Sequence, residues 1–220
     1  VGDHPRSVVD IQHVYLLKGQ DVGGHLVAVL GLGQHQPGQE PAQRDGQAPV
    51  ESEGRHGTGS WASASAVTDG ERVYAYFGNH GLYCYSIEGK QLWKKEWPAF
   101  KTRYGWGLAA SPVLHKGRLY VVNDNEQQSF LVALDAKTGK QIWRVNREGE
   151  KSNWSTPFIW ENKLRTEIIT PGTRKNRAYD LTGKLLYQFG GNSSITIATP
   201  YAKFGLLFVT SGYVGDRKKP

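Results

Sequence analysis

The chain contains no methionine and a single cysteine, Cys84, in 220 residues. One cysteine excludes a disulfide framework or a cysteine-based zinc site within this sequence. No apolar run approaches the ~18 residues that a membrane-spanning helix needs, and the longest, Leu26–Leu32, is far shorter. Because the sequence does not begin with methionine, we interpret it as a processed chain or a fragment, in which no secretory leader can be read.

Aromatic residues and charge are distributed unevenly. Of 25 Phe, Trp and Tyr residues, Tyr15 alone lies within residues 1–60, which also hold five of the seven histidines. That segment carries a net charge of −3, whereas residues 61–220 carry +10. Residues 31–59 are rich in Gly, Pro and Gln and cannot bury enough apolar area to offset the entropy of ordering. We therefore expect residues 1–60 to be disordered or, alternatively, to be non-native sequence from a misassigned start or frame.

From Trp61 onward the sequence consists of short β-rich runs separated by turn signals such as Asp69-Gly70 and Glu88-Gly89. Helix signals are nearly absent. Four runs of about five residues within about 35 residues, joined by tight turns, predict an antiparallel meander.

This meander repeats. Gly-Lys pairs begin at positions 89, 139 and 183, which are 50 and 44 residues apart, and a second series, Ala66, Pro112, Pro157 and Pro200, is spaced by 46, 45 and 43. A four-stranded unit of about 45 residues has the size of a propeller blade. The predicted fold class is therefore all-β, a β-propeller of about three and a half four-stranded antiparallel blades in an incomplete ring. The predicted blades are residues 61–97, 105–149 and 152–193, with a partial blade at 195–220.

Four positions of each blade share a residue type, and each type has a structural reason. A small residue lets a neighbouring strand approach, a short oxygen accepts backbone N–H bonds in the turn, a glycine permits positive φ, and an aromatic ring packs against the adjacent blade. In chain order the structural repeat residues are Cys84, Ser86, Gly89 and Trp93, then Ala133, Asp135, Gly139 and Trp143, then Ala178, Asp180, Gly183 and Tyr187.

The sequence ALDAKTGKQIW at 133–143 resembles the tryptophan-docking motif of PQQ-like, or quinoprotein-type, β-propeller repeats. The resemblance covers roughly Trp61 to the C-terminus, and Ser86 and Tyr187 depart from the pattern. Similar repeats occur in alcohol dehydrogenases that use pyrroloquinoline quinone (PQQ) and in the lipoprotein scaffold of bacterial outer-membrane β-barrel assembly. Because the family closes its ring with about six to eight blades, we expect this chain to be part of a larger ring, with unpaired edges at 61–68 and 205–212.

No catalytic residue is predicted. Quinone-dependent members of the family use calcium, a catalytic Asp and a cysteine pair, and none of these can be assigned here because Cys84 aligns with Ala133 and Ala178 in a small buried position. Asp135 and Asp180 are interpreted as turn residues, and the scattered histidines lack metal-ligand spacing. No metal site and no cofactor are therefore expected, except PQQ and calcium if the chain belongs to a dehydrogenase.

The loops before each first strand are the remaining candidates for a site, because such loops can line one face of a propeller. They are Lys101–Gly107, Glu150–Ser155 and Gly190–Ser194. Arg103, Trp106, Asn153 and Trp154 combine hydrogen-bond donors with flat apolar surface and are the predicted ligand- or partner-binding residues. The alternative is that Trp106 and Trp154 simply pack between blades.

The predicted function is that of a non-catalytic binding or scaffold module of an exported bacterial protein, binding a protein, a peptide or a small ligand. The resemblance alone implies an extracytoplasmic, periplasmic or cell-envelope location. The positive charge lies in separated pairs at 94–95, 174–175 and 218–219, which favours a solvated surface over nucleic-acid binding. The alternatives are a fragment of a PQQ-dependent dehydrogenase whose active site lies outside this chain, and a sensor domain attached to another domain.

Overall fold

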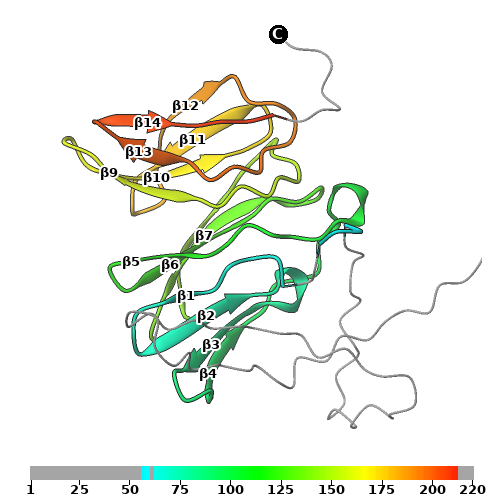
Figure 1. Cartoon of the computed structure of the whole chain (residues 1–220), viewed down its shortest axis with the longest axis vertical. Coiled ribbons are helices and arrows are strands. Elements are labelled where there is room, and N and C mark those ends of the chain that lie inside the picture. The colour runs from blue at the N-terminus through cyan, green and yellow to red at the C-terminus, as the bar shows by residue number, and fades with distance from the viewer. Residues whose placement is uncertain (1–55, 60–61, 213–220) are drawn as a thin grey trace, which may run out of the picture.

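The fold was analysed in a computed structural model that describes residues 56–59 and 62–212. Three four-stranded antiparallel sheets follow one another along the chain, and a two-stranded sheet comes last (Figure 1). The strands are β1 (Val67–Thr68), β2 (Arg72–Tyr76), β3 (Leu82–Ser86), β4 (Gln91–Lys95), β5 (Val113–His115), β6 (Arg118–Asn123), β7 (Phe130–Asp135), β8 (Gln141–Asn146), β9 (Phe158–Glu161), β10 (Thr166–Pro171), β11 (Lys175–Tyr179), β12 (Leu185–Gly190), β13 (Tyr201–Lys203) and β14 (Leu206–Phe208). Within the described ranges the helical elements are two short 3-10 turns, η1 (Gly78–His80) and η2 (Arg103–Gly105).

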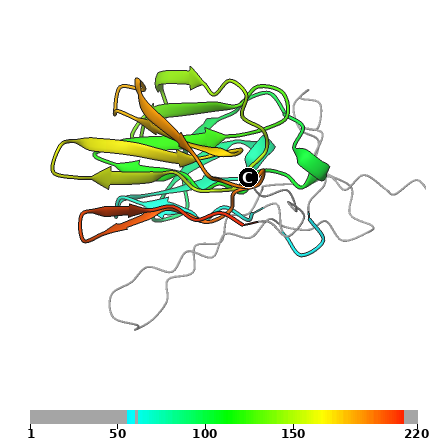
Figure 2. The ribbon, with the colours of Figure 1, turned by 90° about the horizontal axis from the view of Figure 1, so that it is seen from above.

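Each sheet is a meander in which strands pair in the order of the sequence. The sheets stack face to face, as Figure 1 shows from the side and Figure 2 from above. The predicted all-β architecture of three complete blades and a partial fourth is confirmed. Most of residues 1–60, and with them the prediction of disorder or non-native sequence, lie outside the described residues.

Strand pairing explains the small residue of the repeat. Cys84, Ala133 and Ala178 are fully buried, each on the third strand of its blade. Ala133 pairs with Tyr120 on one side and with Trp143 on the other, so a larger side chain would collide with two rings. A register shift follows the small residue in all three blades, and such a bulge increases the local twist of the strand.

In blades 2 and 3 the turn after the third strand is held by the Asp carboxylate of the repeat. The Asp135 carboxylate accepts bonds from the Thr138 backbone N–H and hydroxyl at 2.8 and 2.7 Å. Asp180 accepts the equivalent pair from Thr182 at 2.8 and 2.6 Å. These bonds stabilise the ionised carboxylate, and the pKa of Asp135 is lowered, chiefly by the Thr138 hydroxyl.

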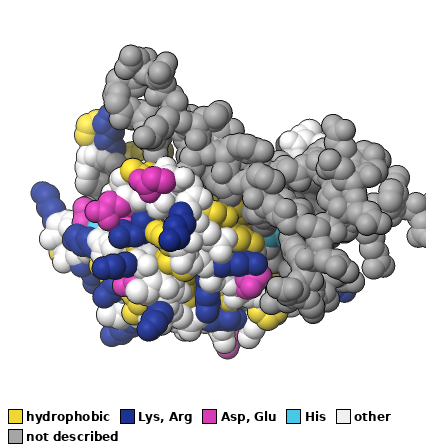
Figure 3. Space-filling model, turned by 90° about the horizontal axis from the view of Figure 1, so that it is seen from below, with side chains coloured by type: hydrophobic (Ala, Val, Ile, Leu, Met, Phe, Trp, Pro, Cys, Tyr) yellow, Lys and Arg dark blue, Asp and Glu magenta, His cyan; other side chains and the backbone are white. Residues whose placement is uncertain are grey.

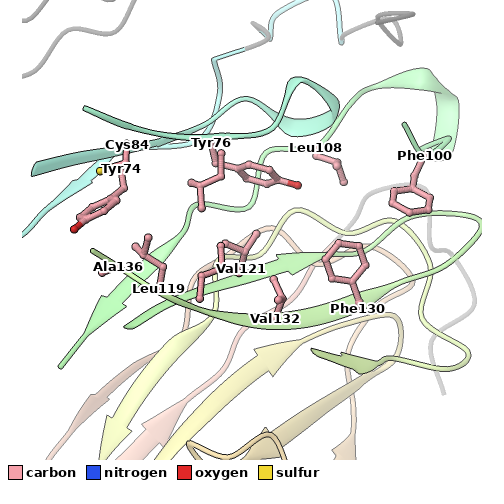
Figure 4. Close-up of a cluster of buried hydrophobic side chains, with 12 residues drawn as sticks. Tyr74, Tyr76, Cys84, Phe100, Leu108, Leu119, Val121, Phe130, Val132 and Ala136 are labelled. Atoms are coloured by element: carbon pink, nitrogen blue, oxygen red, sulfur yellow. The ribbon is translucent and has the colours of Figure 1, made fainter. Parts of the chain in front are cut away.

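Two hydrophobic clusters join neighbouring blades. In the first, Tyr74 and Tyr76 of β2 face Leu119 and Val121 of β6, with Phe130 at one end (Figure 4). The second lies between blades 2 and 3. Its buried members are Tyr120, Val122, Leu131, Ala133, Ile168 and Tyr179. No blade can bury both of its faces alone, so this stacking supplies the core.

Charged side chains of both signs are interspersed over the surface seen from below, at the end formed by blade 1 (Figure 3). Lys94 illustrates the pattern: its ammonium contacts Glu96 at 2.5 Å and lies 5.1 Å from the centre of the Tyr83 ring. Basic residues on outer strands also discourage edge-to-edge pairing with other sheets. The pair at 218–219 lies outside the described residues.

Candidate functional site

The loops that precede each first strand, and those that join the second and third strands, come together at one end of the blades. Their meeting follows from the meander, because alternate connections of an antiparallel sheet lie at the same end. The turn η2 marks this end on the right of both views (Figure 1, Figure 2). We call this end of the molecule the loop face.

Three of the four predicted site residues meet at the loop face. The rings of Trp106 and Trp154 lie 5.5 Å apart, and the Trp154 indole N–H donates to the Gly107 carbonyl at 2.8 Å. The Arg103 guanidinium donates to the Ser194 carbonyl at 3.3 Å. Two loops that are about 50 residues apart in the sequence therefore form one aromatic and basic surface.

Asn153, the fourth predicted residue, lies beneath this surface and is 1% exposed. Its side-chain amide donates to Asp124, while its carbonyl oxygen is buried without a hydrogen-bond partner. A ligand resting on the face would not reach Asn153. The residue instead contributes to a polar cluster between blades 2 and 3.

Tyr104 was not predicted, yet its side chain is the most exposed aromatic of the loop face, at 65%. Its ring lies 4.8 Å from that of Trp106, which extends the aromatic surface outward. Its backbone has φ 60° and ψ 11°, a left-handed conformation that is strained for a bulky residue and that concentrates at functional sites. The sequence signal is weak, because Tyr-Gly in a loop is an ordinary turn pair.

A buried ion pair lies within blade 2, under the loop face. The Arg147 guanidinium donates to both oxygens of Asp124, at 2.8 and 2.9 Å, and both side chains are completely inaccessible. Burial alone would lower the pKa of Arg147, but the charge of Asp124 reverses this and raises it, so the arginine stays protonated. Arg147 also contacts Thr170 of β10, which fixes blade 3 against blade 2.

A second buried pair lies beside the first. Arg177 of β11 contacts the Glu150 carboxylate and donates to the Glu148 carbonyl at 2.7 Å. The other Glu150 oxygen accepts the Thr173 backbone N–H at 2.6 Å. Burial raises the pKa of Glu150, although Arg147 and Arg177 favour its ionised form. These charged residues, outside the repeat motif, are the part of the site that sequence reasoning missed.

The same blade position is apolar at the preceding interface. Four residues after the strand tryptophan, blade 1 has Trp97 where blade 2 has Arg147. Trp97 packs against Tyr76 and Phe130, with ring centres 6.1 and 5.7 Å apart. The interface of blades 1 and 2 is therefore aromatic at this end, and that of blades 2 and 3 is ionic.

A comparison with protein-family models matches residues 35–187 to the family described as outer membrane protein assembly factor BamB. The match covers more than half of the 220 residues. The chain belongs to this family. The matched range begins earlier than the repeat that is evident from Trp61 onward. It ends within β12, so it covers blades 1 and 2 and most of blade 3 of the BamB-like chain.

Solved structures are similar to part of this chain at low identity. Quinohemoprotein alcohol dehydrogenase from Comamonas testosteroni is 22% identical over 59% of this chain and 21% of that chain, with a TM-score of 0.44. A europium-containing methanol dehydrogenase is 12% identical over 57% of this chain and 31% of that chain, with a TM-score of 0.46. A protein of unknown function from Bacteroides caccae is 16% identical over 64% of this chain and 49% of that chain, with a TM-score of 0.40. The chain thus spans less than half the length of each. A comparison with curated protein sequences gave no match.

The residues that this BamB-like chain presents do not fit a calcium–quinone site. The two buried carboxylates at the loop face, Asp124 and Glu150, are held by Arg147 and Arg177. In the described ranges, no group of three or more His, Cys, Asp or Glu side chains is placed to hold a metal ion. Burial raises the pKa of the free Cys84 thiol to about 12, so it is protonated at neutral pH.

In the described part of the chain, no helix is long and apolar enough to span a bilayer.

Proposed function

We propose that the chain is a non-catalytic binding module of an exported bacterial protein, and that its loop face contacts a protein partner. The observation that carries the proposal is the Tyr104–Trp106–Trp154 series of rings beside Arg103, three loop aromatics that no repeat position requires. Aromatic and Arg side chains are the types most enriched at binding hot spots. The family's description as an outer membrane protein assembly factor supports a protein partner and an extracytoplasmic location.

The charged cluster below the loop face supports the same proposal. Its arginines and carboxylates are paired with one another, so they stiffen the two blades rather than stand ready for proton transfer. Arg103 itself is anchored, because its backbone N–H donates to the Ser152 hydroxyl at 2.8 Å. A rigid surface loses less conformational entropy when a partner binds.

Photo-crosslinking tests the loop face. A photoreactive amino acid is placed at Tyr104 in the full-length gene product, in the cells that make it, with Leu164 as the control position. Leu164 is 85% exposed and lies in the β9–β10 turn, at the opposite end of blade 3. We expect one adduct of defined mass from position 104 and none from 164, and a several-fold lower yield when Arg103→Ala is added. Equal labelling at the two positions would refute a dedicated loop face.

The alternative function is a quinone-dependent oxidoreductase whose active site lies on other blades. It is favoured by the likeness of fold to the alcohol and methanol dehydrogenases named above. Loading the full-length product with PQQ and calcium, followed by a dye-reduction assay with alcohols and sugars, separates the two functions. Reproducible substrate-dependent turnover would overturn the non-catalytic assignment.

A further inference from the structure

One carboxylate serves two cations beside the aromatic rings of the loop face. Oε1 of Glu126 lies 3.6 Å from Arg103 Nε, and Oε2 lies 3.8 Å from Lys151 Nζ. Both distances exceed the length of a hydrogen bond, and the carboxylate accepts one from the Ser152 backbone N–H instead, at 3.1 Å. The charges of Arg103 and Lys151 are therefore only partly neutralised by Glu126.

Both cations are held in place by backbone carbonyls. The Arg103 guanidinium donates to the Ser194 carbonyl at 3.3 Å, and the Lys151 ammonium donates to the Glu126 carbonyl at 3.0 Å. A carbonyl has no net charge, so these bonds position the cations without neutralising them. Guanidinium and ammonium groups have several N–H donors each, which leaves donors for a further acceptor. An anionic acceptor forms the strongest hydrogen bonds with such groups.

The accessible charge of the loop face is mostly positive. Asp124 and Glu150, which are buried under the face, are each paired with a buried arginine, and Glu96 pairs with Lys94 at 2.5 Å. The charged side chains that remain accessible in these loops are four cations and two carboxylates. They are Lys101, Arg103, Lys151 and Arg174, and Glu126 and Glu148. This surface attracts a negatively charged segment and repels a positively charged one.

An exposed ring adjoins the two cations. Trp106 is largely surrounded, because Tyr104 and Trp154 lie 4.8 and 5.5 Å from it and the His56 ring is perpendicular to it at 4.7 Å. Tyr104 is 65% exposed, so its ring is the one that an incoming side chain contacts first. Tyr104 directly follows Arg103 in η2, which places an aromatic contact next to a charged one.

We propose that the loop face binds an acidic segment of a partner protein, with a carboxylate between Arg103 and Lys151 and an aromatic side chain on Tyr104. This inference rests on the proposed function and adds the chemistry of the partner. An extended segment presents every second residue on one face, about 7 Å apart. An acidic residue and an aromatic residue two positions apart therefore match the two adjoining contacts.

Glu126 has a specific role in this arrangement. It is a carboxylate of the chain itself, and it lies next to the two cations that the partner's carboxylate contacts. The two carboxylates repel each other, so Glu126 weakens the binding of an acidic segment. A purely structural Glu126 has no such effect, and this difference provides the test.

Labelled peptides that repeat Asp-Ser-Tyr-Ser test the inference by fluorescence anisotropy against the full-length gene product. In an extended conformation they present Asp and Tyr alternately on one face. We expect saturable binding that weakens about tenfold when Asn replaces every Asp. Replacing every Tyr by Ser should also weaken it, since the contact with Tyr104 is lost. Raising the salt concentration should weaken the binding of the Asp peptide more than that of the Asn peptide.

Substitutions in the protein test the two cations and Glu126. Glu126→Gln should tighten the Asp peptide about threefold, because a repulsive charge is removed while the side-chain oxygen can still accept the Ser152 N–H. Lys151→Gln and Arg103→Gln should each weaken binding. Lys137→Gln is the control, because Lys137 is exposed in the β7–β8 turn at the opposite end of blade 2. Unchanged circular dichroism spectra verify that the variants fold.

Four outcomes would overturn the inference. They are no binding of the Asp peptide, equal binding of the Asp and Asn peptides, no tightening by Glu126→Gln, and co-sedimentation with phosphatidylglycerol vesicles that Arg103→Gln abolishes. The last would identify an anionic membrane surface as the ligand. Photo-crosslinking from position 104 stays independent of these peptides. A defined adduct there alongside any of the first three outcomes would keep the protein partner and reject its acidic character, whereas equal labelling at positions 104 and 164 would reject the partner itself.

Discussion

At the scale of single residues, the contact between a tryptophan and the next blade's glycine defines the blade spacing. A methyl group added to Gly139 would lie 2.7 Å from Trp93 Cε3, and one added to Gly183 would lie 3.0 Å from Trp143 Cε3. Both distances are shorter than normal van der Waals contact. Glycine is thus required for two reasons: the backbone has a positive φ, and the tryptophan ring leaves no room for a side chain.

Gly139→Ala should destabilise the chain more than Gly89→Ala. Both residues have positive φ, 69° and 90°, but a methyl at Gly89 meets nothing within 4 Å. The conformational cost of about 1–2 kcal/mol is common to both variants, while overpacking against Trp93 adds about 1–3 kcal/mol at Gly139 alone. Urea unfolding followed by tryptophan fluorescence measures the difference, and equal midpoints would show that the ring moves aside at no cost.

Asp69 makes stability depend on pH. Burial would raise the pKa of its carboxyl, but bonds from the Tyr74 hydroxyl and from the Glu71 and Arg72 backbone N–H groups lower it to about 2. A pKa below the usual 3.8 means that the folded state binds the proton more weakly than the unfolded state. The stabilisation is therefore complete above pH 4 and is lost as the pH falls toward 2.

Asp69→Asn should lower the unfolding free energy at pH 7 and flatten its decline between pH 4 and 2. Tyr74→Phe keeps the carboxylate but removes one donor, so its decline should be intermediate. Chemical unfolding at a series of pH values tests both. An Asp69→Asn curve parallel to that of the parent would rule out this carboxylate as a source of the pH dependence.

At the scale of elements, the blades could be predicted from the sequence and the loop face only in part. Gly139 and Trp143 repeat because every blade makes the same turn and the same stack. Arg147 and Asp124 do not repeat, and their pairing depends on how two loops cross, which no spacing encodes. Arg103 and Trp154 stand out in the sequence because loop aromatics and arginine are conspicuous in a β-repeat, and the structure places both at the loop face. Their role in binding stays a prediction. Asn153, predicted with them, is buried.

Removing one partner of the buried pair should cost more than removing both. Arg147→Met leaves the Asp124 carboxylate uncompensated and should destabilise the chain by about 3–5 kcal/mol. The double variant with Asp124→Leu should recover much of that loss, because neither charge is then buried. Lys151→Met, an exposed change nearby, is the control. Additive losses in this double-mutant cycle, measured by urea unfolding, would contradict a direct interaction.

At the scale of the whole molecule, the two ends of the described stack are unlike. On the far side of blade 1, Phe77, Tyr83 and Tyr85 are buried. The fourth blade exposes its hydrophobic side chains instead. An unpaired strand edge beside apolar residues favours association. We therefore expect the isolated chain to associate through the exposed side chains and strand edge of the fourth blade.

Phe204→Lys combined with Leu206→Lys should reduce aggregation of the isolated chain by several-fold at high concentration. Both side chains are more than half exposed, so the free energy of unfolding should change little. Static light scattering over a concentration series measures the effect. Leu164→Lys, an equally exposed change in another turn, should leave the scattering unaltered, and a comparable improvement in that control would mean that general charge, not the open edge, governs solubility.

The exchange of Trp97 for Arg147 between successive blades has a consequence for how such a chain can evolve or be engineered. The interfaces between the blades fix the order of the blades, because an aromatic interface surface and an ionic one do not complement each other. Excision of blade 2, residues 105–149, would place Trp97 opposite Thr170 and remove the Glu148 carbonyl to which Arg177 donates. The blades are therefore not interchangeable, although each has the same fold. Recombination between the repeats of the gene is constrained for this reason.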